Sequence, residues 1–121
     1  MTNRDDQVPY SLESIRREFP EGDEIFPQII RIFLDEISGK MDRLAEANRT
    51  VDIAGIGKIA HSLANSTGAV RAYAALELSR ALERKARLGE SAAIGPIIAQ
   101  LSREIAEVIT VLEQYQAGED K

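Results

Sequence analysis

The stretch FPQIIRIFLDEISGKMDRL, residues 26–44, decides the fold of this chain. Its large apolar side chains recur at steps of three and four residues, which is the period of one face of an α-helix. This spacing predicts a helix that begins near Asp23 or Pro27, runs to about Asn48 and has the length of a helix in a four-helix bundle. The side chains are Phe26, Ile30, Phe33, Ile37, Met41 and Leu44, with Ile25, Ile29 and Ile32 widening the stripe beyond a coiled-coil seam.

The residues on either side of this stretch continue the helical period and lack the alternation typical of strands. Ser11 can cap a short helix that ends before Pro20, because the residue before a proline disfavours helical geometry. Asp52 can cap a second long helix, which comes to its end near Gly68. On this helix Ile56, Ile59 and Leu63 are expected to face the core.

A third long helix is expected over residues 72–88, with Gly89 as its stop. A fourth begins between Ser91 and Pro96 and runs to about Gln116. Because the connections are short, consecutive helices should be antiparallel neighbours. The predicted fold class is therefore all-α, an up-down-up-down four-helix bundle with a short N-terminal helix.

One bundle domain is expected over residues 11–116, because the chain of 121 residues suits a single core. Residues 1–10 are expected to be a flexible lead-in, and residues 117–121 a flexible tail. Charged residues interrupt every apolar run, so no membrane span is expected, and the N-terminus lacks a signal-peptide pattern. The expected location is the cytoplasm.

The composition excludes several kinds of site. The chain has no cysteine and a single histidine, so disulfides, thiolate sites and histidine-rich metal sites are not expected. The net charge of -5 argues against a nucleic-acid partner. Residues 71–87 are locally basic, which is either an ordinary solvated helix face or a patch that attracts an acidic partner.

The single histidine, His61, lies on the outward face of the second long helix, about 180° from Leu63 and its apolar neighbours. Small residues share that face, although glycine costs a helix roughly 1 kcal/mol relative to alanine. This pattern predicts a flat surface over which another protein can close. The small residues are Ala54, Gly57, Ala64 and Gly68, with Lys58 and Asn65 beside them.

An exposed imidazole is a capable nucleophile near neutral pH. The helix of His61 carries no carboxylate that could act as its base, and Glu77 and Glu83 on the next helix are interpreted as surface charge. Hydrolysis by this chain alone is therefore not expected. Accepting a group from a partner that brings its own catalytic residues suits the pattern better.

The residues around His61 resemble the motif of the histidine-containing phosphotransfer (HPt) domain, which reads AHxLKGS followed by a glycine. The matching residues are Ala60, His61, Ser62, Leu63, Ser66, Gly68 and Ala72. The stretch LSRALERKARLGE, residues 78–90, is similar to the family's third helix and its exit turn. The resemblance extends over roughly residues 12–116.

The resemblance implies that His61 accepts a phosphoryl group from an aspartyl phosphate on a receiver domain and passes it to another receiver. The chain would then be a carrier rather than an enzyme, a cytoplasmic monomer whose partners are response-regulator receivers and a sensor or hybrid histidine kinase. It would need no cofactor or metal of its own, since the receiver supplies Mg²⁺. Gly57, Ala64 and Gly68 would form the docking floor, and Lys58 and Arg71 would contact phosphate or receiver.

Two positions depart from the motif, because Ala64 and Asn65 stand where the family has lysine and glycine. Lys58, one turn away on the other side of His61, is the expected substitute for the lysine, and Asn65 can donate a hydrogen bond to phosphate. Arg71 stands where a glycine is common. Two alternatives stay open: a degenerate relative that binds a kinase or receiver without transfer, and a plain helical-bundle interaction module.

Overall fold

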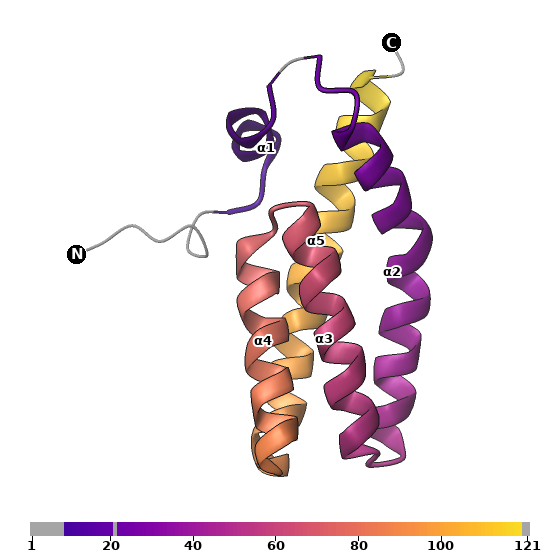
Figure 1. The fold of residues 1–121 in the computed structure, drawn as a ribbon, viewed down its shortest axis with the longest axis vertical. Helices are drawn as coiled ribbons and strands as arrows, with labels where there is room; N and C mark the ends of the chain where they lie inside the picture. Colours follow the sequence, from indigo (N-terminus) through magenta and orange to yellow (C-terminus); the bar gives the residue numbers. More distant parts are fainter. Residues whose placement is uncertain (1–8, 21, 120–121) are drawn as a thin grey trace, which may run out of the picture.

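The computed structural model describes residues 9–20 and 22–119, and most of them are helical. Helices α2 to α5 run alternately up and down as a bundle, while α1 lies beyond the α3–α4 turn, alongside the longer helix α5 (Figure 1). The predicted all-α bundle is confirmed. No helix of the described part is long and apolar enough to cross a lipid bilayer. The elements are α1 (Leu12–Glu18), α2 (Phe26–Arg49), α3 (Ile53–Ala69), α4 (Tyr73–Leu88), the 3₁₀ turn η2 (Ser91–Ala93) and α5 (Ile94–Glu119).

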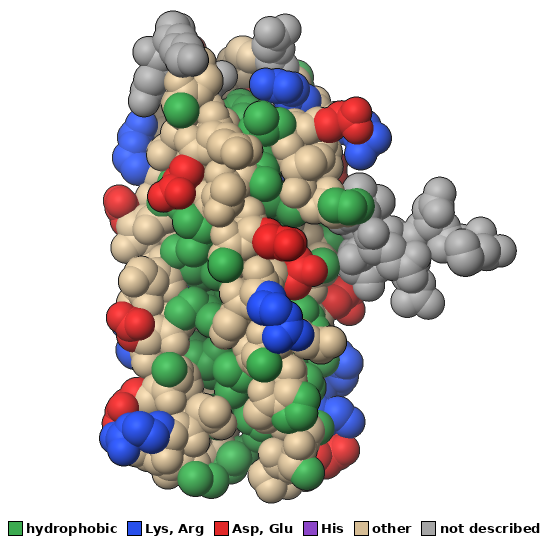
Figure 2. Space-filling model, turned by 180° about the vertical axis from the view of Figure 1, so that it is seen from behind, with side chains coloured by type: hydrophobic (Ala, Val, Ile, Leu, Met, Phe, Trp, Pro, Cys, Tyr) green, Lys and Arg blue, Asp and Glu red, His purple; other side chains and the backbone are tan. Residues whose placement is uncertain are grey.

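The predicted stripe of α2 forms one wall of the core. Its residues from Phe26 to Leu44 form one core with apolar residues of the other long helices, with α3 and α5 as the neighbours of α2, and each fully buried side chain stabilises the fold by roughly 1.5–3 kcal/mol. On the rear face, apolar side chains form a vertical band between charged ones (Figure 2). The fully or nearly buried partners are Ile56, Leu63, Leu82, Leu101, Ile105, Val108 and Leu112.

The expected widening of the α2 stripe is only partly correct. Ile29 is half-buried against the core, but Ile25 and Ile32 are 66% and 58% exposed. At about 100° per residue, these two positions turn away from the centre of the apolar face. The buried surface of α2 is therefore narrower than its sequence indicated.

The helix ends are set by the predicted capping residues. Ser11 accepts a hydrogen bond from the Ser14 N–H in a capping box, and the Asp52 carboxylate accepts from the Gly55 N–H at 3.0 Å. Gly89 ends α4 with a φ of 71°, in the left-handed region that glycine adopts without strain. These caps are confirmed as predicted.

The ends of the domain differ from expectation. Helix α5 continues to Glu119 rather than ending at about Gln116, because Ala117 is a strong helix former. Most of the expected N-terminal lead-in, residues 1–8, lies outside the described residues. Tyr10, however, is packed: its hydroxyl donates to the Val70 carbonyl at 2.7 Å, and burial raises its pKa. The packed region thus begins before Ser11.

Val51, in the turn between α2 and α3, is held in a strained conformation. Its φ is 55°, which costs an L-residue roughly 1–2 kcal/mol, and the cost is greatest for β-branched side chains. The side chain is 70% exposed, so it returns little packing energy. The turn is therefore less stable than it would be with a residue at position 51 that adopts a positive φ without strain.

We predict that Val51→Gly raises the free energy of unfolding by about 1 kcal/mol, because glycine adopts a positive φ without a steric penalty. Urea denaturation monitored by circular dichroism measures the change. Ala54→Gly, on an exposed face within α3, is the matched control and should lower the free energy of unfolding by a similar amount. Equal losses in both variants would contradict the assignment of strain.

Candidate functional site

His61 projects from the middle of α3 toward solvent. Its side chain is 64% exposed, while Ile56 and Leu63 on the opposite side of the same helix are fully buried. The ring is not visible on the rear face of the molecule (Figure 2). The predicted outward orientation of His61 is confirmed, and the ring is open to a partner.

Glu83 on α4 is the immediate partner of the ring. Its Oε2 lies 3.0 Å from His61 Nδ1, and its side chain is only 29% exposed. The interpretation of Glu83 as surface charge was therefore wrong. A signal was available in the sequence: α3 and α4 are joined by the short turn of residues 70–72, so an antiparallel register counted outward from it places Glu83 within one turn of the position opposite His61.

This contact decides which ring nitrogen is reactive. A carboxylate only accepts hydrogen bonds, so the nitrogen that faces it, Nδ1, carries the proton and donates to Glu83. In the neutral ring the lone pair then lies on Nε2. Glu83 thus fixes the tautomer, restrains the ring and leaves the nucleophilic nitrogen outermost.

An open groove of about 520 Å³ lies beside the ring, between α3 and α4. Its apolar part is made of Ile53 and three small residues, and its lining includes two cations, Lys58 and Arg87. Neither cation forms a salt bridge with any residue of the described ranges. Arg87 is a site residue that the sequence did not single out. The lining residues are Ile53, Ala54, Gly57, Lys58, His61, Glu83, Ala86 and Arg87.

The small residues of α3 have a second role that the helical wheel did not reveal. A Cβ on Gly57 would lie 3.5 Å from the Ala86 Cβ, and one on Gly68 would lie 3.7 Å from Leu76 Cδ1. Ala64 is only 9% exposed. These positions lie on the α4 side of His61, where their size lets the two helices approach closely. Of the expected docking floor, only Gly57 lines the groove.

The remaining candidate residues are spread over different surfaces. Asn65 is exposed one turn beyond His61 on the same face of α3, while Lys58 lies one turn before it. Arg71 is not near the ring. It lies in the α3–α4 turn with a φ of 61°, donates to the Gly68 carbonyl and stacks over Phe19 at 5.2 Å. It stands in a left-handed position that suits the glycine common there in the HPt motif.

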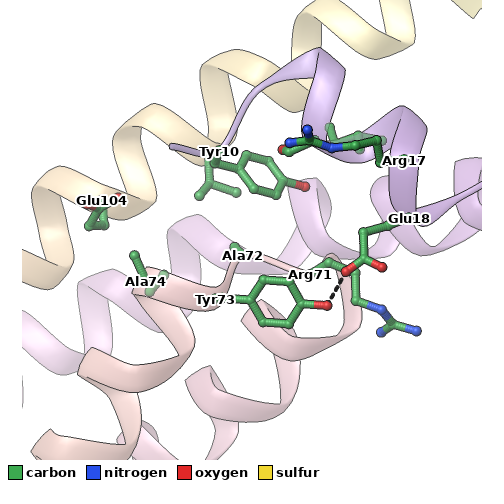
Figure 3. Close-up of a pocket in the computed structure, with 12 residues that line it drawn as sticks. Tyr10, Arg17, Glu18, Arg71, Ala72, Tyr73, Ala74 and Glu104 are labelled. Carbon is green, nitrogen blue, oxygen red and sulfur yellow. Dashed lines mark hydrogen bonds between the residues drawn. The ribbon is translucent and has the colours of Figure 1, made fainter. Parts of the chain in front are cut away.

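Arg71 lines a different pocket, of about 440 Å³, between α1, the α3–α4 turn and α5 (Figure 3). Glu18 and the Tyr73 hydroxyl form a hydrogen bond across it. Burial and the charge of Glu107 raise the pKa of Glu104 on its α5 side. The pocket shares no residue with the His61 groove, so the two are separate features of the surface.

The described part of the chain contains no group of three His, Asp or Glu side chains that could hold a metal ion. Glu83 is the single carboxylate that lines the groove, and it already accepts from the ring. The arrangement can therefore present a nucleophilic imidazole between cations. It does not itself offer the several oxygen ligands that Mg²⁺ prefers.

Comparison with models of protein families matches the Hpt domain over residues 28–114, well over half of the chain. The matched region contains α3, α4 and the His61–Glu83 pair. No match was found among curated proteins or among solved structures.

We predict that Glu83→Ala changes the tautomer of His61. In the wild type at a pH where the ring is neutral, the proton should reside on Nδ1, and loss of the acceptor should move part of the population to Nε2. Long-range ¹H–¹⁵N correlation spectra of the imidazole measure this. Glu77→Ala, an exposed carboxylate one and a half turns away, is the control and should leave the tautomer unchanged. An Nδ1 proton that persists in Glu83→Ala would show that Glu83 does not set it.

Proposed function

Because the chain belongs to the Hpt domain family, we propose that it is a histidine phosphotransfer protein that carries a phosphoryl group on Nε2 of His61. Members of this family take part in phosphorelays as phosphocarriers rather than as independent catalysts. The observation that carries the proposal is the His61–Glu83 hydrogen bond, because it directs the lone pair of the exposed ring toward a partner.

The transfer step follows from this geometry. The Nε2 lone pair attacks the phosphorus of an aspartyl phosphate on a receiver domain, the acyl P–O bond breaks, and the aspartate leaves as a carboxylate. Nδ1 keeps its proton and continues to donate to Glu83, whose negative charge offsets the positive charge that develops on the ring. The reverse reaction passes the group to the aspartate of a second receiver.

The receiver is proposed to supply Mg²⁺ and most of the catalytic groups. Aspartyl phosphate and Mg²⁺ meet on the receiver, while the groove of this chain contributes a nucleophile, one carboxylate that orients it, and two cations. The cations, Lys58 and Arg87, complement an acidic partner surface. We further propose that the chain works as a monomer in the cytoplasm and receives its phosphoryl group through a sensor or hybrid histidine kinase.

Ala64 favours a second candidate, a relative that binds a receiver or kinase without transfer. In the family motif this position is a lysine, one turn from the histidine, where a cation can stabilise the transferred phosphoryl group. Ala64 is nearly buried and cannot supply that charge. The two candidates differ in one observable, the presence of phosphate on His61 after incubation with a phosphorylated receiver.

We predict that the wild-type protein takes up acid-labile phosphate from a phosphorylated receiver and that His61→Gln abolishes the uptake. The variant should keep its helicity and its thermal stability, because the side chain is exposed and packs on nothing in the core. A panel of receivers from the same genome, each phosphorylated chemically, provides the donors. Ser62→Ala is the matched control next to His61 and should retain the uptake.

Acid-labile phosphate that survives in His61→Gln would contradict the assignment of the acceptor. A wild-type protein that binds a receiver but never takes up phosphate would support the binding-only candidate. If the wild-type protein binds no receiver and accepts phosphate from none, the remaining interpretation is a plain helical-bundle interaction module.

A further inference from the structure

The two cations of the His61 groove lie on facing helices at the same side of the ring along the bundle axis, but their side chains tilt in opposite directions. In an α-helix, side chains lean toward the N-terminus of their own helix. His61 therefore leans toward the preceding turn of α3, and Lys58 in that turn leans further away from the ring. Helix α4 is antiparallel to α3, so the Cα–Cβ bond of Arg87 is tilted back toward Glu83, which contacts the imidazole.

The position of Arg87 on α4 strengthens this placement. Arg87 follows Glu83 by four residues, and side chains at this spacing are neighbours on one face of a helix. Glu83 touches the ring, so the guanidinium can reach the same region. Among the other cations of α4, Arg80 pairs with Glu77 and Lys85 pairs with Glu90, while Arg84 does not line the groove. Arg87 is exposed, lines the groove and forms no salt bridge with a described residue.

We infer that Arg87 supplies the cation that the motif lysine would supply from position 64, and that its guanidinium binds the phosphoryl oxygens on Nε2 of His61. This inference rests on the proposed function. A planar guanidinium can donate to two phosphoryl oxygens at once, which makes it a suitable ligand for the group. The cation then comes from α4, and position 64 holds a small, nearly buried residue. Arg87, rather than Lys58, replaces the lysine.

The test begins with phosphoramidate, a small phosphoryl donor that needs no partner protein. Nε2 attacks its phosphorus, the P–N bond breaks, and ammonia leaves. The pKa of the resulting phosphoryl group is then read from a ³¹P NMR titration of wild type, Arg87→Ala, Arg87→Lys, Lys58→Ala and Arg31→Ala. Arg31, an exposed arginine on α2 outside the groove, provides the control.

A neighbouring cation favours the dianionic phosphoryl group and lowers its pKa. Arg87→Ala should therefore raise this pKa by about 0.5–1 unit, and Arg87→Lys should restore part of the difference. Lys58→Ala should change it by less than half as much, and Arg31→Ala should leave it unchanged. In transfer from a phosphorylated receiver, Arg87→Ala should slow the rate roughly tenfold, which is the value of one charge-assisted hydrogen bond.

A rescue variant separates loss of the cation from loss of the side chain. Asn65 is exposed one turn beyond His61 on α3, and a side chain there leans back toward the ring. Asn65→Lys added to Arg87→Ala should lower the phosphoryl pKa again and recover transfer. Circular dichroism should show that all of these exposed substitutions keep the helical fold.

Each result has one consequence. A wild-type protein that takes no phosphate from phosphoramidate or from any receiver overturns the proposed function and this inference with it. Normal phosphorylation with an unchanged pKa in Arg87→Ala overturns the inference alone. A larger shift in Lys58→Ala than in Arg87→Ala assigns the role to Lys58 and also overturns it. A shift that is at least twice as large in Arg87→Ala as in Lys58→Ala, and that Asn65→Lys reverses, supports it.

Discussion

The close packing of α3 against α4 is the constraint on which the site depends. Gly57 and Gly68 lie beside Ala86 and Leu76 of the facing helix, and Ala64 on the same face of α3 is nearly buried. At this short separation the Glu83 carboxylate reaches His61 Nδ1 directly. A Cβ at either glycine would meet these side chains at ordinary contact distance, so alanine would fit there, whereas a longer side chain at Gly57 would press against α4. The small residues therefore contribute to the site mainly through the packing of α3 against α4. Only Gly57 among them lines the open groove.

The register of α3 and α4 is fixed at their connecting turn. Residues of the N-terminal segment around α1 contact this turn and stabilise it. The Tyr10 hydroxyl donates to Val70 in the turn, and Arg71 stacks over Phe19. Glu18 and Tyr73 add a hydrogen bond between α1 and the start of α4 (Figure 3). Helix α1 thus closes the end of the bundle and supports the α3–α4 hairpin. Its contribution to the site is structural, since none of these residues lines the His61 groove.

The fold could be predicted from the sequence because the signals for each helix lie within its own stretch of residues. These signals are the apolar period and capping residues such as Ser11 and Asp52. The outward orientation of His61 could also be predicted from the positions of the apolar residues on its own helix. The role of Glu83 could not be recognised on a single helical wheel, because its contact with His61 depends on the register between two helices. Arg71 was misplaced because a helix that ends near Gly68 does not show where the next side chain goes, and in the structure that side chain stacks over Phe19.

The central claim is that the Glu83 hydrogen bond makes Nε2 of His61 the atom that carries phosphate. The most direct measurement is the bonding of phosphorus in the phosphorylated protein, determined by NMR correlation of the ³¹P nucleus with the ¹⁵N nuclei and carbon-bound protons of the ring. We expect phosphorus on Nε2, with Nδ1 still protonated and donating to Glu83. Phosphorus on Nδ1 would contradict the account, because the carboxylate occupies that side of the ring.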